Sequence, residues 1–215
     1  MSRPIIQNIV CTCNIGSTLY LPQVCRCLHV MEYNPKRFAA VTFRQHNPSA
    51  TALIFSSGRI VCTGTKSRMD ARLAMISFVY TLHQRMNLNI NVHQFAIQNI
   101  VASASTGFSL CLPDLYAHHS RQSSYDPELF PGLIFRDSTL PAVVLIFESG
   151  KMVITGAKKE KDVTHVYNTI IPLLIPYMSE QNIPPSTTFK DVLKHVRGVP
   201  VLSLDDFAPL LNEHI

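Results

Sequence analysis

Cysteine and histidine are the residues of this chain that could bind a metal or take part in catalysis. Two C-x-C pairs occur near the N-terminus, Cys11 with Cys13 and Cys25 with Cys27. Structural zinc sites usually place two to four residues between their cysteines, so this spacing favours burial of the thiols as small hydrophobes. The nine histidines are scattered, and the pair His118-His119 has no carboxylate or cysteine at ligand spacing.

No other motif points to catalysis. The sequence contains no glycine-rich phosphate loop and no nucleophile elbow. We therefore expect no enzyme, no metal and no cofactor. The opening stretch MSRPIIQNIV lacks the layout of a signal peptide. No run approaches the roughly 18 apolar residues of a membrane span, so we expect an intracellular protein without a membrane partner.

Charge is distributed unevenly along the 215 residues. Residues 1–94 hold ten Lys/Arg against two acidic residues, a net charge of +8. Residues 95–178 hold six against seven, a net of −1, and residues 179–215 hold three against five, a net of −2. A basic half predicts a polyanionic partner, and a near-neutral half leaves room for a protein partner. An ordinary solvated basic surface is the alternative that charge alone leaves open.

One stretch of the chain occurs twice. Residues 53–66 read LIFSSGRIVCTGTK and residues 145–158 read LIFESGKMVITGAK, at a spacing of 92 residues. A tandem duplication decides the architecture, and it predicts two halves related by a pseudo-twofold axis. We place the first repeat at 1–94, the second at 95–178, and a C-terminal tail of unassigned role at 179–215.

Each repeated stretch is predicted to form a hairpin, because strand-like runs flank Ser57-Gly58 and Ser149-Gly150. Alternation along the strands sorts the side chains of each hairpin onto two faces, and both faces are apolar. Each face therefore needs a cover: helices can cover one, and a second sheet, a partner or a ligand can cover the other. One of the two faces comprises Leu53, Phe55, Val61 and Thr63 in the first copy and Leu145, Phe147, Val153 and Thr155 in the second.

The remaining patterns predict an α+β fold with helices on one sheet face. Residues 179–188 are polar and Pro-rich and mark a boundary. A short helix is predicted beyond it at 189–198. The expected strands span 5–14, 37–46, 51–56, 59–65, 96–105 and parts of 131–157. The expected helices span 19–30, 68–86, 112–120 and 160–178.

At these residues the sequence resembles the TATA-box-binding protein family over roughly residues 4–178. The motifs are EYNPKRFAAV at 32–41, SSYDPELFPGLIFR at 123–136, and the two LIFxSG hairpins. The resemblance implies a saddle, a curved ten-stranded antiparallel sheet with helices on its convex face. It also implies a general or specialised transcription initiation factor of the nucleus, which binds and bends A·T-rich double-stranded promoter DNA through the minor groove and nucleates preinitiation complexes.

The resemblance also assigns roles to residues. Four phenylalanines match wedges that push between base steps: Phe38, Phe55, Phe130 and Phe147. The minor-groove floor matches Asn8, Val10, Thr12, Leu53, Val61, Thr63, Asn99, Val101, Ser103, Leu145, Val153 and Thr155. Phosphate contacts match Arg37, Arg44, Arg59, Lys66, Arg136, Lys151 and Lys158. A loop that family members present to transcription factor IIB matches Asp126, Glu128 and Leu129.

The chain departs from the family in the helix after the first hairpin. Typical members carry a basic helix there for transcription factor IIA and repressors, but Ile76, Ser77, Tyr80 and Gln84 stand where cations are expected. Partners similar to transcription factor IIA, and TBP-associated factors, are therefore left open. The alternative function is a protein-interaction module that keeps the saddle and binds DNA weakly. An exposed apolar underside also predicts self-association when DNA is absent.

Overall fold

The structure, a computed structural model, describes residues 2–29, 33–88, 90 and 92–179. Its nine strands are hydrogen-bonded in the order β2-β3-β4-β1-β5-β9-β8-β7-β6. The pairs β1–β4, β2–β3, β3–β4, β6–β7, β7–β8 and β8–β9 are antiparallel. In chain order the strands are β1 (Ser2–Asn14), β2 (Ala40–His46), β3 (Ser49–Phe55), β4 (Arg59–Thr65), β5 (His93–Ser105), β6 (Ser123–Ser124), β7 (Gly132–Phe135), β8 (Val143–Phe147) and β9 (Lys151–Ala157).

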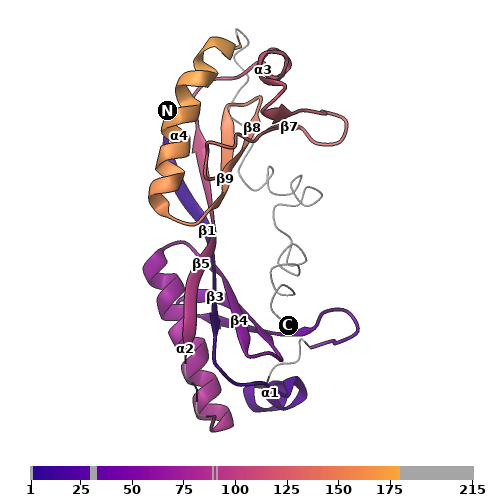
Figure 1. The fold of residues 1–215 in the computed structure, drawn as a ribbon, viewed down its shortest axis with the longest axis vertical. Coiled ribbons are helices and arrows are strands. Elements are labelled where there is room, and N and C mark those ends of the chain that lie inside the picture. Colours follow the sequence, from indigo (N-terminus) through magenta and orange to yellow (C-terminus); the bar gives the residue numbers. More distant parts are fainter. Residues whose placement is uncertain (1, 30–32, 89, 91, 180–215) are drawn as a thin grey trace. The chain divides into compact units, whose positions relative to one another are not determined.

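Four α-helices lie between and after these strands (Figure 1). They are α1 (Leu21–Leu28), α2 (Arg68–Met86), α3 (Leu112–His119) and α4 (Glu160–Leu174), followed by the 3-10 helix η1 (Ile175–Tyr177). This composition confirms the predicted α+β class. Among the described residues, no helix combines the length and apolar content that a membrane crossing requires.

Contacts divide the chain into two compact units. One comprises Ile5–Ala102 with Gly156–Val163, and the other, among the described residues, comprises 2–4, Ser103–Thr155 and 164–179. The units do not coincide with the predicted repeat boundaries, because β1, β5 and β9 each contribute to both of them. The boundaries at 94 and 178 remain predictions.

Helix α2 shows why the sequence folds as it does in the first unit. Ser67 caps its N-terminus by accepting a hydrogen bond from the Asp70 backbone N–H at 3.0 Å. Asn87 ends the helix in the left-handed conformation that C-terminal caps favour, at φ 50°. Its buried side chains recur with helical spacing and meet strands β3 and β4, and Phe78 contacts Phe43 of β2 edge to face. The predicted helix 68–86 is confirmed.

Two sequence predictions need correction. The helix predicted at 160–178 ends as an α-helix at Leu174, because Pro176 lacks the N–H group that a further α-helical turn would use, whereas Pro172 lies within α4. The strand predicted at 37–46 begins at Ala40, since residues 34–38 form a turn in which the Phe38 N–H donates to the Asn34 carbonyl oxygen. Nine strands lie among the described residues, and the tenth strand stays a prediction.

The repeat indicates where the tenth strand is expected. Strand β6, at Ser123–Ser124, corresponds in the 92-residue register to positions 31 and 32, which lie outside the described residues. The helix predicted at 189–198 also lies outside them.

Candidate nucleic-acid interface

The cross-strand register places the predicted floor residues of the first half side by side. Leu53 of β3 lies opposite Val61 of β4, and Val61 lies opposite Thr12 of β1. Directly opposed residues in an antiparallel sheet share one face. Val10 occupies the same face of β1 as Thr12 by strand alternation, although the register shifts between Ile9 and Cys11.

The second half repeats this row. Leu145 of β8 lies opposite Val153 of β9, and Thr155 lies opposite Val143. Val101 and Ser103 occupy alternate positions of β5 and so share one face of that strand. The predicted apolar floor residues are buried, while Thr12, Thr63, Ser103, Val143 and Thr155 are half-buried.

The two predicted asparagines are held in matching ways. The Asn8 Oδ1 accepts a hydrogen bond from the Gly64 N–H at 2.8 Å, and the Asn99 Oδ1 accepts one from the Gly156 N–H at 2.7 Å. A backbone N–H donates only, so these bonds fix which end of each carboxamide is oxygen. The Asn8 Nδ2 also donates to Thr63 Oγ1 at 3.1 Å. Each amide is therefore oriented by its own strand pair.

The four predicted wedges form two pairs. The ring centroids of Phe38 and Phe55 are 6.1 Å apart with the rings inclined at 71°, and those of Phe130 and Phe147 are 5.7 Å apart at 70°. Both geometries are edge-to-face contacts, which aromatic pairs prefer. The structure therefore brings each repeat's two wedges together in the same way.

The turn before each pair is duplicated as well. The Phe38 N–H donates to the Asn34 carbonyl oxygen and the Phe130 N–H donates to that of Asp126, both at 2.9 Å. The Asp126 Oδ1 also accepts from the Glu128 N–H at 3.1 Å. This turn leaves the side chain of Leu129 85% exposed, between Glu128 and the second wedge pair.

A small residue lies opposite the second wedge of each half. Ala40 is paired with Phe55, and Gly132 is paired with Phe147. A Cβ added at Gly132 would lie 2.8 Å from Cε1 of Phe130 and 2.9 Å from Cε1 of Phe147. The second pair of rings thus occupies the space that a side chain at 132 would need.

The predicted phosphate contacts lie at the solvent boundary of the fold. Arg59 and Lys151 begin β4 and β9 and are half-buried. The other five are exposed: Arg37, Arg44, Lys66, Arg136 and Lys158.

The predicted burial of the cysteines holds for Cys11, Cys13 and Cys62, whereas Cys25, Cys27 and Cys111 are half-buried. Cys11, Cys13 and Cys62 are buried, and the Cys13 thiol lies 3.3 Å from the sulfur of Met75 on α2. Burial and the neighbouring Cys62 raise the pKa of Cys13 to about 12. The pKa of Cys11 is also raised, first by its hydrogen bond with Cys62 and then by burial. Thiols protonated at neutral pH are poor nucleophiles and poor metal ligands.

Sequence analysis missed several residues of the same face. Thr42 lies opposite Leu53 and Ile134 lies opposite Leu145, so both extend the floor rows. These two residues are 92 apart, and that register was the available signal. Gln98 was also missed: its Nε2 donates to Thr12 Oγ1 at 2.8 Å. A contact between positions 86 residues apart leaves no local pattern in a sequence.

The fold and this surface define a class of duplicated α+β proteins whose strands carry repeat-matched aromatic and amide side chains. The sequence profile described as "Transcription factor TFIID (or TATA-binding protein, TBP)" matches residues 3–85 and 94–177. The chain therefore belongs to the TATA-binding protein family.

Individual relatives agree with this assignment. The chain is 45% identical over 171 residues to the TATA-box-binding protein of Artemia franciscana, an alignment covering 80% of this chain and 62% of the relative. It is 46% identical over 171 residues to that of Caenorhabditis elegans, covering 80% and 50%. The chain thus spans only about half to three-fifths of these two relatives.

A solved structure is similar in fold as well as sequence. The Methanococcus jannaschii TBP superposes with a TM-score of 0.68 at 36% identity, covering 80% of this chain and 98% of that structure. The resemblance to the family that the motifs indicated is confirmed.

Proposed function

We propose that this protein is a nuclear transcription initiation factor that binds A·T-rich promoter DNA through the minor groove and bends it. The duplicated phenylalanine pairs support this function most strongly. Each pair contacts edge to face at the end of a strand pair, β2 and β3 in one repeat and β7 and β8 in the other, and each repeat also carries an asparagine oriented by a backbone N–H. A core built only for stability has no need of matched ring pairs together with matched amides.

The phenylalanines are the wedges of this mechanism. Apolar side chains inserted between base steps unstack them and kink the duplex, a mechanism for which TATA-binding proteins are themselves the standard example. Phe38 with Phe55 would act at one step and Phe130 with Phe147 at another. Two rings already in contact would enter a step as one rigid unit, which lowers the entropy lost on binding.

The floor accounts for the A·T preference. Apolar side chains such as Leu53, Val61 and Val153 offer no partner to the guanine N2 amino group, which would be desolvated without a hydrogen bond. With their oxygens held by Gly64 and Gly156, Asn8 and Asn99 direct Nδ2 groups at the acceptors that A·T and T·A pairs both present. The floor therefore selects A·T over G·C and does not separate A·T from T·A.

The basic side chains supply affinity and register. Phosphate contacts release counterions, so binding weakens as salt rises. Arg59 and Lys151 begin equivalent strands, and Lys66 and Lys158 follow the equivalent strands, so both halves would contact the backbone at matching places.

Nucleation of the preinitiation complex would use the loop before the second wedge pair. The exposed Leu129, flanked by the carboxylates of Asp126 and Glu128, suits a partner similar to transcription factor IIB that offers an apolar pocket with basic residues at its edge.

A second candidate function is an interaction module with weak DNA binding. One observation favours it: α2 exposes large apolar side chains where a solvated helix would carry polar ones. Intact wedge pairs in both halves oppose it, because a protein that had lost DNA binding would have no use for them.

A binding series separates the two functions. Fluorescent A·T-rich and G·C-rich duplexes of equal length would be titrated with the full chain over a range of salt concentrations, with bending followed by energy transfer between the duplex ends. Tight, salt-sensitive binding with a large bend on the A·T-rich duplex alone is expected. Weak binding without sequence preference would reject the first function and favour the interaction module.

A further inference from the structure

Helix α2 exposes a continuous line of large apolar side chains. Met69, Leu73, Ile76 and Tyr80 are 67%, 49%, 59% and 62% exposed. Their spacings of four, three and four residues form the seam of a heptad repeat, and His83 continues it by three more. Such a seam on a helix is the pattern that packs against a second helix.

The repeat provides an internal control for this seam. In the 92-residue register, the seam positions of α2 correspond in α4 to Lys161, His165, Asn168 and Pro172. The buried positions of α2 remain apolar in α4, but the exposed apolar ones become polar or proline. The fold of a repeat therefore does not require an apolar seam on this helix.

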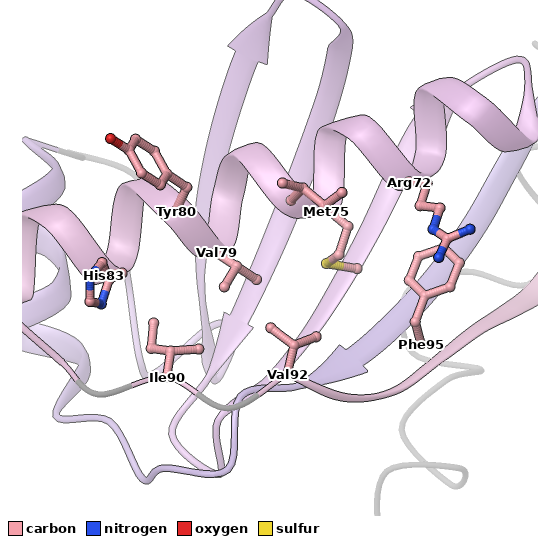
Figure 2. A pocket seen from close by; sticks show the side chains of 9 residues that line it. Arg72, Met75, Val79, Tyr80, His83, Ile90, Val92 and Phe95 are labelled. Atoms are coloured by element: carbon pink, nitrogen blue, oxygen red, sulfur yellow. The ribbon is translucent and has the colours of Figure 1, made fainter.

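A groove runs beside the seam between α2 and the segment leading into β5 (Figure 2). Its volume is about 460 Å³, within the range of ligand sites. Ile76 and Tyr80 line it from α2, with Ile90 and Val92 across from them. Arg72 and Phe95 lie at one end and His83 and Ile90 at the other (Figure 2).

The exposed charges beside the seam have one sign. Arg68 and Arg72 are exposed within about 100° of the seam around the helix, whereas Arg85 projects from the other side. The one carboxylate of α2, Asp70, accepts a hydrogen bond from the Ser67 hydroxyl at 2.7 Å in the N-terminal cap. No Asp or Glu is among the described residues that line the groove. A binding segment must therefore be apolar along its centre and acidic along its edges.

We propose that the α2 seam and this groove dock an acidic amphipathic helix of another protein. Its apolar side chains at heptad positions would pack between Leu73, Ile76 and Tyr80 and fill the groove. Its flanking carboxylates would pair with Arg68 and Arg72, which lie beside the seam. This surface recognises its partner through apolar contact, in place of the cations that family resemblance predicts at 76 and 80.

Two other occupants fit the charges less well. A second copy of this chain would bring its own α2 against the seam. Each α2 carries a net charge of +2, from Arg68, Arg72 and Arg85 against Asp70, so two such helices repel each other. The chain's own tail offers a predicted helix at 189–198 with three cations against one acid, and an acidic stretch at 205–213 interrupted by Pro209.

The test uses the full chain and a synthetic helical peptide of about three heptads, with leucine at positions a and d and glutamate at e and g. Saturable binding is expected by fluorescence anisotropy. The double variant L73H/I76N, which installs the residues of α4, should weaken it at least about tenfold. The matched control K161A/H165A on α4 should leave the Kd unchanged. Circular dichroism and the Tm would confirm that each variant is folded.

Four results would overturn the proposal. The first is unchanged peptide binding by L73H/I76N, and the second is equal binding of a peptide with lysine in place of glutamate. The third is a wild-type dimer that L73H/I76N dissociates. The fourth is tenfold tighter peptide binding by L210S/L211S, which would place the tail on the groove. Bending of A·T-rich DNA by L73H/I76N should match the wild type, so a failure here is distinguishable from a failure of the DNA-binding function.

Discussion

Helices α2 and α4 agree on their buried sides and differ on their exposed sides. Five of the six buried positions of α2 have buried counterparts in the 92-residue register, namely Ala71 with Val163, Ala74 with Val166, Phe78 with Ile170, Val79 with Ile171 and Leu82 with Leu174, while Met75 corresponds to the half-buried Tyr167. The exposed seam of α2 has only polar or proline counterparts in α4. Packing has preserved one side of the duplication, while the solvent-facing sides have become different surfaces.

The strands differ from the helices, because their predicted DNA-binding positions match between the two halves. Amide anchors, wedge pairs and the turns before them match in both halves, down to hydrogen-bond lengths within 0.1 Å for the two asparagines, at 2.8 and 2.7 Å. One difference interrupts this match: Ala40 lies beside the first wedge pair and Gly132 beside the second. The first pair is half-buried, whereas Phe130 and Phe147 are buried. The two halves therefore share the same strand face, and the second phenylalanine pair packs more closely against it than the first pair does.

The largest expected effect concerns the glycine turns that the two halves share. Gly58 and Gly150 have φ of +81° and +73°, and a Cβ at either would overlap a backbone carbonyl oxygen, of Ser17 or Phe108. Alanine at either position should lower the free energy of unfolding by about 3 kcal/mol or more, from strain and overlap together.

Gly64 is the matched control for these turns. Its φ of +101° is also positive, but the nearest atom to an added Cβ is 3.6 Å away, so Gly64→Ala should cost only the conformational strain of about 1–2 kcal/mol. Urea denaturation would measure all three variants. Equal losses would show that the Ser17 and Phe108 carbonyls do not limit the turns.

A smaller effect tests the difference at the wedges. Gly132→Ala should cost a net of about 1–2 kcal/mol of unfolding free energy, because the rings of Phe130 and Phe147 must move away from the new Cβ. The reverse change in the first half, Ala40→Gly, should cost about 1 kcal/mol through backbone entropy. Gly132→Ala should also reduce the DNA bend, and Ala40→Gly should not. A neutral or stabilising Gly132→Ala would refute the closer fit of the second pair.

The smallest effect concerns charge. Lys66→Gln and Lys158→Gln should each reduce the slope of log Kd against log salt by about 1, since each removes one phosphate contact. Equal reductions are expected although residues 1–94 carry a net charge of +8 and residues 95–178 a net charge of −1. Lys161→Gln on α4 is the control and should leave the slope unchanged. A slope that responds only to Lys66→Gln would confine phosphate contact to the basic half.

The sequence predicted the strand face because a duplication supplies its own alignment. Leu53 with Val61, and Leu145 with Val153, follow from alternation about two glycine turns, and the structure pairs them as expected. Helix α2 followed from its period and its Ser67 cap. The family motifs then carried the functional roles, which pattern alone could not assign.

Other features depended on contacts that no local pattern encodes. The bonds from Asn8 to Gly64 and from Gln98 to Thr12 join positions 56 and 86 residues apart. Phe38 was placed in a strand because its neighbours are strand-like, but the Asn34 carbonyl holds it in a turn. In the sequence, the α2 seam is visible only as positions that lack the expected cations. The exposure of Ile76 and Tyr80 depends on which side of the helix packs against the sheet, and no local pattern encodes that.

The central claim is that each half kinks DNA with its own phenylalanine pair. Energy transfer across an A·T-rich duplex would compare the wild type with F38A/F55A, with F130A/F147A and with the quadruple variant. Phe43→Ala is the stability control, because Phe43 contacts Phe78 of α2 on the opposite face. Each double variant should lose part of the bend and weaken binding by at least about 2 kcal/mol, and the quadruple variant should not bend the duplex. A full bend retained by F130A/F147A would contradict the claim.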